Sequence, residues 1–261
     1  MNPLRPVLRA WLPGLCFAVA ACAVAACTAQ AGDVKVLSAG AAKAAVIPLG
    51  EEFARLTGHN VTIDFGPMGL LTEKLAKGEQ ADLLVVSGEV ADALEKNGTI
   101  VRGSRRAMAQ VGVGVAVGLN APAPDISTAA AFRKTLLDAR SIVMIDPARG
   151  TSGKHLVEVF QRLGVTDLIK AKTRYGLGGF IVEPVARGEV ELGLHQISEI
   201  LPVKGVRLVG PLPPELQKWT TYSSALTPAG SNSEAAREFA AYLSSFPSKA
   251  VYLSHGFAVA D

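Results

Sequence analysis

An imidazole and a carboxylate lie close together in the sequence, near the end of a predicted strand. His195 lies in the segment Leu192-Gly-Leu-His-Gln196, and Glu199 follows four residues later. Held in contact, these groups can act as an acid–base couple that moves a proton on a bound molecule. They can equally form a hydrogen bond that only supports the fold, which is the commoner role of an isolated pair. The sequence alone leaves both roles open.

Metal binding and nucleophilic catalysis have less support. His155-x-x-Glu158 and His195-x-x-x-Glu199 imitate metal spacings, but no third ligand is evident, so we expect no metal site and no cofactor. The segment 150–154 (GTSGK) lacks the leading glycine of a phosphate loop, and a histidine follows it in place of Ser or Thr. A Gly-x-Ser-x-Gly elbow is absent from the sequence, which disfavours a serine hydrolase.

Turns rich in glycine and small hydroxyl residues offer a different chemistry. There are four, at residues 38–40, 66–69, 150–153 and 176–179. A helix that begins at such a turn presents unpaired N–H groups and partial positive charge, which hold an anion. Glycine lets the ligand approach the backbone closely. Glycine turns also serve the fold of any α/β protein, so they favour an anion site only modestly.

These turns separate short apolar runs from amphipathic stretches. Strands are predicted over 34–38, 61–65, 81–86, 111–117, 141–145 and 192–196, and helices over 46–56, 70–77, 152–163, 180–186, 233–244 and 248–255. Their alternation predicts an α/β fold with parallel-type sheets flanked by helices. Because open sheets bind ligands beyond the carboxyl ends of their strands, two such units predict two lobes with a ligand cleft between them.

The first 31 residues read as an export leader. Arg5 and Arg9 precede an apolar run that suits a signal peptide and is short for a membrane span. Ala29-Gln30-Ala31 fits a peptidase site, whereas Val24-Ala25-Ala26-Cys27 has the form of a lipoprotein box, in which Cys27 would be lipidated. We therefore expect a periplasmic protein, soluble or anchored through Cys27.

Removal of the leader narrows the chemistry further. All three cysteines lie within it, so the mature body can form neither a disulfide nor a thiolate site. The formal net charge falls from +3 to about +1 when two arginines are removed, and no basic block is present. This composition argues against nucleic acid as a partner. A chain of about 230 residues can build its core without disulfides.

Three segments resemble one known family. Val34-Lys-Val-Leu-Ser-Ala-Gly40, Ala81-Asp-Leu-Leu-Val-Val-Ser87 and Ala186-Arg-Gly-Glu-Val-Glu-Leu-Gly193 are similar to the periplasmic molybdate-binding proteins, which are type II solute-binding proteins. The resemblance implies a two-lobed fold with lobe 1 over 32–115, lobe 2 over 116–221 and a return to lobe 1 over 222–261. Molybdate binders of this kind carry serines where this chain has Ala41 and the turn 66–69 (GPMG). Two hydroxyl donors that molybdate would need are therefore missing, which disfavours molybdate as the ligand.

A divergent branch of that family, the aconitate isomerases, is more similar still. The shared segments are Leu37-Ser-Ala-Gly40, Pro67-Met-Gly69 and Leu192-Gly-Leu-His-Gln-Ile-Ser-Glu199. Ligand-binding positions follow from this resemblance and from the glycine turns; they are Ser38, Ala39, Gly40, Met68, Gly69, Thr151, Ser152, Gln196, Ser198 and Tyr222. If the protein is an enzyme, proton transfer needs an acid and a base, for which His195 and Glu199 are the catalytic candidates and Lys154 and Tyr222 are alternatives.

Two functions remain open. As a binding protein, the chain would trap a small anion, an organic di- or tricarboxylate rather than molybdate, and deliver it to an ABC-type membrane permease. Arg149 or Lys154 could add positive charge to that site. As an enzyme, it would interconvert cis- and trans-aconitate by proton transfer. In either case we expect a monomer, because ligand traps of this size commonly act as single subunits.

Overall fold

The computed structural model describes residues 31–259. Residues 1–30 of the predicted leader, Cys27 among them, lie outside the described residues. None of the helices within residues 31–259 combines the length and the apolar composition that crossing a bilayer requires. Two five-stranded sheets organise this part of the chain. We call each sheet with its flanking helices a lobe.

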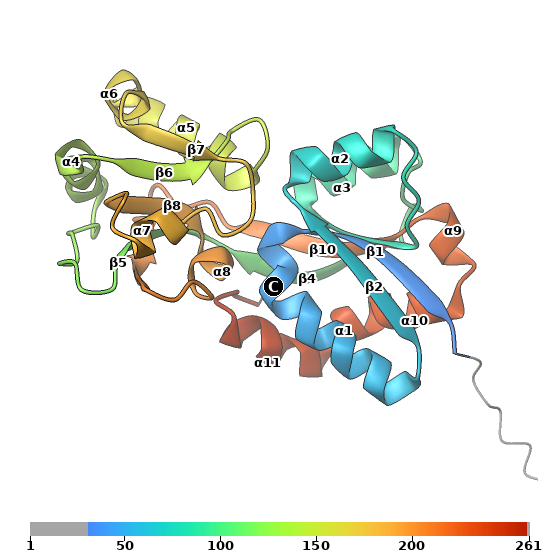
Figure 1. Cartoon of the computed structure of the whole chain (residues 1–261). Helices are drawn as coiled ribbons and strands as arrows, with labels where there is room; N and C mark the ends of the chain where they lie inside the picture. Colours follow the sequence, from blue (N-terminus) through green and yellow to red (C-terminus); the bar gives the residue numbers. More distant parts are fainter. Residues whose placement is uncertain (1–30, 260–261) are drawn as a thin grey trace, which may run out of the picture. The chain divides into compact units, whose positions relative to one another are not determined.

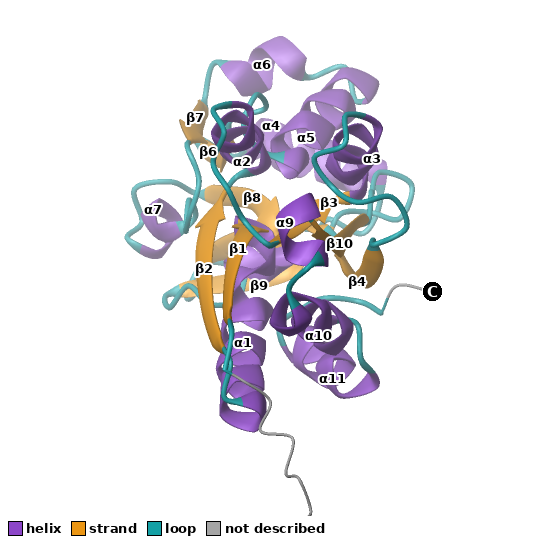
Figure 2. Ribbon diagram, turned by 90° about the vertical axis from the view of Figure 1, so that its right-hand side faces the viewer, coloured by secondary structure: helices purple, strands orange, loops and turns teal. Residues whose placement is uncertain are grey.

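The first lobe is built on a sheet with the strand order β2-β1-β3-β10-β4. Its strands are β1 (Asp33–Ala39), β2 (Asn60–Gly66), β3 (Leu83–Ser87), β4 (Arg106–Val111) and β10 (Thr220–Leu226). One face packs on α1 (Lys43–Thr57), α10 (Glu234–Leu243) and α11 (Phe246–Ser254), and the other on α2 (Met68–Ala76) and α3 (Gly88–Lys96) (Figure 1). Two short elements complete the lobe, the 3-10 turn η1 (Gly40–Ala42) and α9 (Pro228–Ser231). Figure 2 shows α10 and α11 side by side.

The second lobe repeats this layering with the strand order β7-β6-β8-β5-β9. Its strands are β5 (Val113–Gly118), β6 (Ile142–Ile145), β7 (Thr173–Gly176), β8 (Leu192–Gln196) and β9 (Val206–Pro211). One face carries α4 (Ala129–Asp138), α5 (Thr151–Arg162) and α6 (Thr166–Lys170), and the other carries α7 (Glu183–Ala186) and α8 (Ile197–Ile200). The two-lobed α/β architecture expected from the sequence is therefore present.

The hydrophobic pattern of the strands explains which of them lie in the centre of each sheet. Every residue of β3, β6 and β8 is buried, as expected for apolar strands covered by helices on both faces. On α5, Leu156, Val159 and Phe160 form the buried face. In the first lobe, the rings of Phe53 and Phe239 pack 4.9 Å apart between α1 and α10. Each sheet is thus fixed between two apolar layers.

The sheets are mixed rather than wholly parallel. In the first sheet β1 runs parallel to β2 and β3, but β10 runs antiparallel to β3 and β4. In the second sheet β6 runs parallel to β7 and β8, but β5 runs antiparallel to β8 and β9. The antiparallel strands lie next to the points where the chain crosses between lobes, so they do not belong to strand–helix–strand units.

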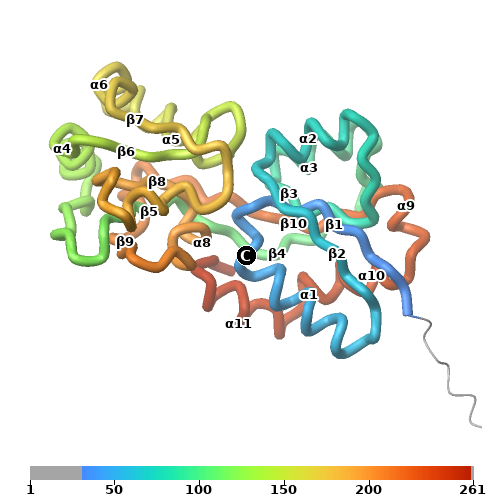
Figure 3. The backbone as a smooth tube through the Cα atoms, in the orientation of Figure 1, coloured from blue at the N-terminus to red at the C-terminus, as the bar shows by residue number. Residues whose placement is uncertain are grey.

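The first crossing corrects one predicted element. The sequence predicts a single strand over 111–117, whereas β4 ends at Val111 and β5 begins at Val113 in the other sheet (Figure 3). The Gln217 side chain secures this break, because its amide accepts from the N–H of Val113 at 3.0 Å and donates to the carbonyl of Val113 at 2.8 Å. A Cβ on Gly112 would lie only 2.7 Å from the same amide. Glycine at this position therefore lets the crossing close on Gln217.

Candidate functional site

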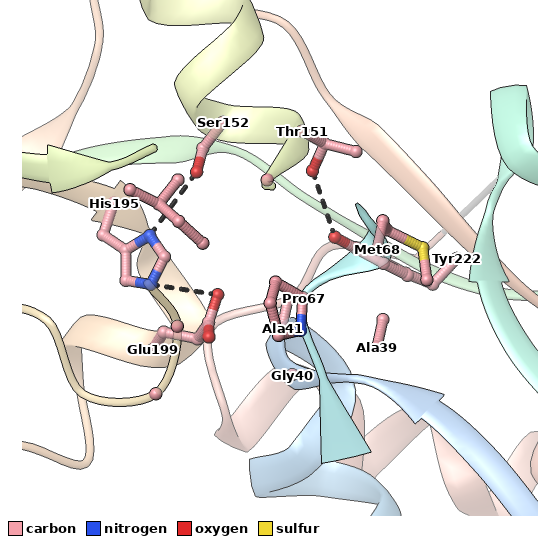
Figure 4. A pocket seen from close by; sticks show the side chains of 14 residues that line it. Ala39, Gly40, Ala41, Pro67, Met68, Thr151, Ser152, His195, Glu199 and Tyr222 are labelled. Atoms are coloured by element: carbon pink, nitrogen blue, oxygen red, sulfur yellow. Dashed lines mark hydrogen bonds and ion pairs between the residues drawn. The ribbon is translucent and has the colours of Figure 1, made fainter. Parts of the chain in front are cut away.

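A cavity lies where strands of both sheets end. Figure 4 shows its lining, which comes from the turn after β1, the start of α2 and β10 in the first lobe, and from the ends of β6 and β8, the start of α5 and the loop after β7 in the second. The lining residues are Ala39, Gly40, Ala41, Pro67, Met68, Ile145, Gly150, Thr151, Ser152, Gly178, Gly179, His195, Glu199 and Tyr222. Centres of water molecules could occupy about 20 Å³ of it, which is room for one or two waters in this closed arrangement. We call it the inner cavity.

Helix starts supply much of the cavity wall. Residues 40–42 form η1, which leads directly into α1, and neither helix start has a side-chain cap. On the other side α5 begins at Thr151 after Gly150, again without a side-chain cap. The first N–H groups of a helix have no partner within that helix. Two helix starts without side-chain caps therefore border the inner cavity, an arrangement that suits a small anion.

Buried hydroxyl groups line the same wall. The Tyr222 hydroxyl lies 3.4 Å from Oγ1 of Thr151, which also accepts from the Gln196 side chain at 3.3 Å. Tyr222 is 2% exposed, and burial raises the pKa of its hydroxyl above the ordinary value of 10.0. This hydroxyl therefore stays protonated at neutral pH and can donate to an anionic ligand.

His195 and Glu199, brought together by the end of β8 and the start of α8, are an imidazole and a carboxylate side by side in the lining. The imidazole Nε2 lies 3.2 Å from a carboxylate oxygen of Glu199, and Nδ1 lies 3.4 Å from Oγ of Ser152. His195 is 1% exposed and Glu199 is 9% exposed. Figure 4 shows the imidazole of His195 with one contact to Ser152 and another to Glu199. The imidazole thus lies between a hydroxyl at a helix start and a buried carboxylate, within the distance at which proton transfer is possible.

The contact between His195 and Glu199 lacks hydrogen-bond geometry. Among the contacts within residues 31–259, Nε2 of His195 has no hydrogen-bond partner although the atom is buried. The carboxylate of Glu199 instead approaches the turn after β1, where a Cβ on Gly40 would lie 3.2 Å from its Oε1. Glu199 thus faces the start of η1 as well as the imidazole.

Eight of the twelve predicted site residues line the inner cavity. They are Ala39, Gly40, Met68, Thr151, Ser152, His195, Glu199 and Tyr222.

Four others lie behind the lining or beside it. The Ser38 hydroxyl donates to the carbonyl of Ala39, and the Ser198 hydroxyl donates to the carbonyl of Ala41 at 2.7 Å. The side-chain amide of Gln196, which does not line the cavity, donates to Oγ1 of Thr151. The N–H of Gly69 donates to the carbonyl of Arg149 at 2.9 Å, and a Cβ on Gly69 would lie 2.9 Å from the carbonyl oxygen of Ala148. Ser198 and Gly69 therefore connect the two lobes in this closed arrangement.

The expected cations lie elsewhere. Lys154 lies 3.6 Å from Glu89 beside a separate cavity, and Arg149 contributes a backbone carbonyl to the lobe contact. Neither lines the inner cavity. Within residues 31–259, no three His, Cys, Asp or Glu side chains gather in a way that could hold a metal ion.

Several lining residues were not among the individually predicted site residues. Ala41 and three members of the predicted glycine turns line the inner cavity; the three are Pro67, Gly178 and Gly179. The cation Lys43, which was not predicted, lines an adjoining chamber. A signal for Lys43 was present, because it follows directly on the turn after the first strand. The place of Gly178 and Gly179 depends on how the loop after β7 approaches Pro67, where a Cβ on Gly178 would lie 3.0 Å from Cδ.

Comparison with known proteins agrees with this geometry. The family model described as "Bacterial extracellular solute-binding protein" matches residues 34–258. This chain belongs to that family. Members of the family bind small ligands, which accords with a cavity between two lobes.

Individual relatives include two different activities. An aconitate isomerase of a Pseudomonas species is 34% identical over 215 residues, which is 80% of this chain and 81% of the relative. The molybdate-binding protein ModA of Azotobacter vinelandii is 28% identical over 239 residues, 89% of this chain and 92% of that one. The solved structure of the Azotobacter vinelandii periplasmic molybdate-binding protein superposes with a TM-score of 0.74 at 19% identity, covering 87% of this chain and all of that chain. The last comparison speaks for the fold alone.

Proposed function

We propose that this protein binds a small organic di- or tricarboxylate in the inner cavity. The observation that carries the proposal is the composition of the lining, in which helix starts and the Tyr222 hydroxyl face Ala39, Ala41 and Met68. The N–H groups and hydroxyl suit carboxylate oxygens, and the apolar side chains suit a carbon skeleton. An inorganic oxyanion such as molybdate would gain nothing from apolar side chains.

Because the space in the closed arrangement admits only one or two waters, entry of an organic acid requires the lobes to open. Closure around the ligand would then restore contacts such as that between Gly69 and Arg149. The 34% identity with an aconitate isomerase supports a carboxylate as the ligand.

Thermal denaturation tests the binding step. We expect trans-aconitate or a related di- or tricarboxylate to raise the melting temperature of the purified protein more than molybdate does. Stabilisation by molybdate together with indifference to carboxylates would refute the proposal.

Isomerisation of aconitate is the second candidate, and the position of Glu199 favours it. A carboxylate beside an anion site weakens binding by repulsion, so its presence needs another reason. As a base, the Glu199–His195 couple would take a proton from the methylene carbon of cis-aconitate. The double bond shifts, and return of a proton to the former alkene carbon gives the trans isomer. One C–H bond breaks and one forms, so no co-reactant is needed.

Turnover separates the two candidates. Incubation with cis-aconitate, followed by proton NMR, would show the trans isomer if the protein is an isomerase. His195→Ala should then abolish conversion while the melting shift with trans-aconitate persists. A protein that binds carboxylates but converts none at any concentration acts as a transport component.

For the transport role, we propose that the protein is exported to the periplasm, works as a monomer and delivers its ligand to an ABC-type permease. Intact-mass measurement of the exported protein distinguishes a soluble product cleaved after Ala31 from one lipidated at Cys27.

A further inference from the structure

An outer chamber adjoins the inner cavity. The two share the lining residues Gly40, Pro67, Gly178, Gly179 and Glu199. Centres of water molecules could occupy about 450 Å³ of the chamber, against about 20 Å³ of the inner cavity. These shared residues, Glu199 among them, therefore lie at the boundary between the two spaces.

The walls of this chamber are mostly apolar. Ala44, Ile47 and Phe65 come from the first lobe, and Leu177, Phe180 and Pro202 from the second. Leu177 is 62% exposed and Phe180 is 41% exposed. Apolar walls with a few placed polar groups are typical of sites for organic ligands.

One positive charge borders the chamber, because the exposed residue Lys43 lines it. The ammonium of Lys43 lies 5.8 Å from the ring centre of Phe65 and 5.6 Å from that of Phe180. Phe65 lies near the end of β2 in the first lobe and Phe180 lies in the second, so the ammonium lies near an aromatic ring of each lobe. Among residues 31–259, no acidic side chain forms an ion pair with Lys43, whereas Lys154 and Lys218 both contact Glu89. Lys43 is thus available to an anion from outside the chain.

We propose that the outer chamber is a second subsite of the ligand, in which Lys43 binds a carboxylate at the far end of an apolar or unsaturated carbon chain. This inference rests on the proposed binding of an organic carboxylate in the inner cavity. The rings of Phe65 and Phe180 hold the ammonium in place, and an ammonium–carboxylate contact is a charge-assisted hydrogen bond. The preferred ligand therefore carries at least two carboxylates, separated by carbon that crosses the shared lining.

Calorimetric titration with trans-aconitate and with the monocarboxylate crotonate tests the subsite. Lys43→Met should weaken binding of trans-aconitate by about tenfold, the effect of losing one charge-assisted hydrogen bond, while crotonate changes by less than about twofold. Lys170→Met is the matched control, because Lys170 is exposed on α6 in the second lobe. It should leave both affinities unchanged.

Three outcomes would overturn the inference. They are a loss under about twofold for trans-aconitate with Lys43→Met, an equal loss for trans-aconitate and crotonate, and the same loss with Lys170→Met. If the wild-type protein binds neither acid, the proposed function itself fails and the inference falls with it. Equal melting temperatures of the ligand-free variants confirm that both have folded.

Discussion

The N–H of Gly69 donates a 2.9 Å hydrogen bond to the carbonyl oxygen of Arg149, and this bond joins the start of α2 in the first lobe to the turn before α5 in the second. Both segments lie next to residues that line the inner cavity, Met68 and Gly150. The lobes can come this close because residue 69 has no side chain. The residues that hold the lobes together are therefore direct neighbours of residues that line the inner cavity.

Gly69→Ala should hinder closure. Its Cβ would lie 2.9 Å from the carbonyl oxygen of Ala148, which is backbone and cannot turn aside. If the closed state then forms a tenth as often, affinity for trans-aconitate falls about tenfold. Calorimetry measures the affinity, and X-ray scattering measures compaction on ligand addition.

Gly210→Ala is the control for this change, because its Cβ would meet only the Cδ1 of Ile126 at 3.6 Å. Wild-type affinity and compaction in Gly69→Ala would show that this contact does not limit closure.

Glu199→Gln should separate binding from turnover. Removing the negative charge next to the inner cavity should tighten binding of trans-aconitate at least about fivefold, since repulsion between close charges is lost. If the protein is an isomerase, loss of the base should slow conversion by about a hundredfold or more. Titration calorimetry and proton NMR measure the two effects.

Glu51→Gln, an exposed position on α1, serves as the control and should change neither. Weaker binding in Glu199→Gln would mean that the carboxylate supports the site rather than opposing the ligand.

Stability should fall in alkali partly through Tyr222. Burial raises the pKa of this hydroxyl, so the folded protein keeps a proton that the unfolded chain releases above its ordinary value of 10.0. The contribution is fully present below pH 10 and is lost as pH rises beyond it, at up to about 1.4 kcal/mol per pH unit. Urea unfolding between pH 8 and 11, compared between wild type and Tyr222→Phe, isolates this slope. Parallel curves for the two proteins would contradict it.

The first crossing between the lobes should depend on Gln217. Gln217→Ala leaves the N–H of Val113 without its 3.0 Å acceptor, while the carbonyl of Val113 keeps the N–H of Leu212. An unpaired buried donor costs about 1–3 kcal/mol of unfolding free energy. Urea denaturation measures the loss.

Gln80→Ala is a suitable comparison for Gln217→Ala, because Gln80 donates only to the carbonyl of Gly78 at an exposed turn. Equal stability of the two variants would show that solvent replaces the amide of Gln217.

Much of the layout of the fold could be predicted from local sequence patterns. The buried runs of β3 and β6 and the spacing of Leu156, Val159 and Phe160 on α5 are properties of short segments, and they predicted strands and a helix where the structure has them. The break at Gly112 could not be predicted in this way. Residues 111–117 are uniformly apolar or glycine, and what divides them is the amide of Gln217, which lies a hundred residues away.

The sequence by itself determined that two α/β units meet at glycine-rich turns and that His195 and Glu199 lie within reach of each other, because these features depend on residue type and spacing. Only the tertiary structure decided the rest. It placed Gly69 in a lobe contact, put Ser198 behind Ala41 and moved the available cation from Arg149 and Lys154 to Lys43. These outcomes depend on which backbone groups the two lobes bring together, and distances between lobes are not encoded in any local pattern.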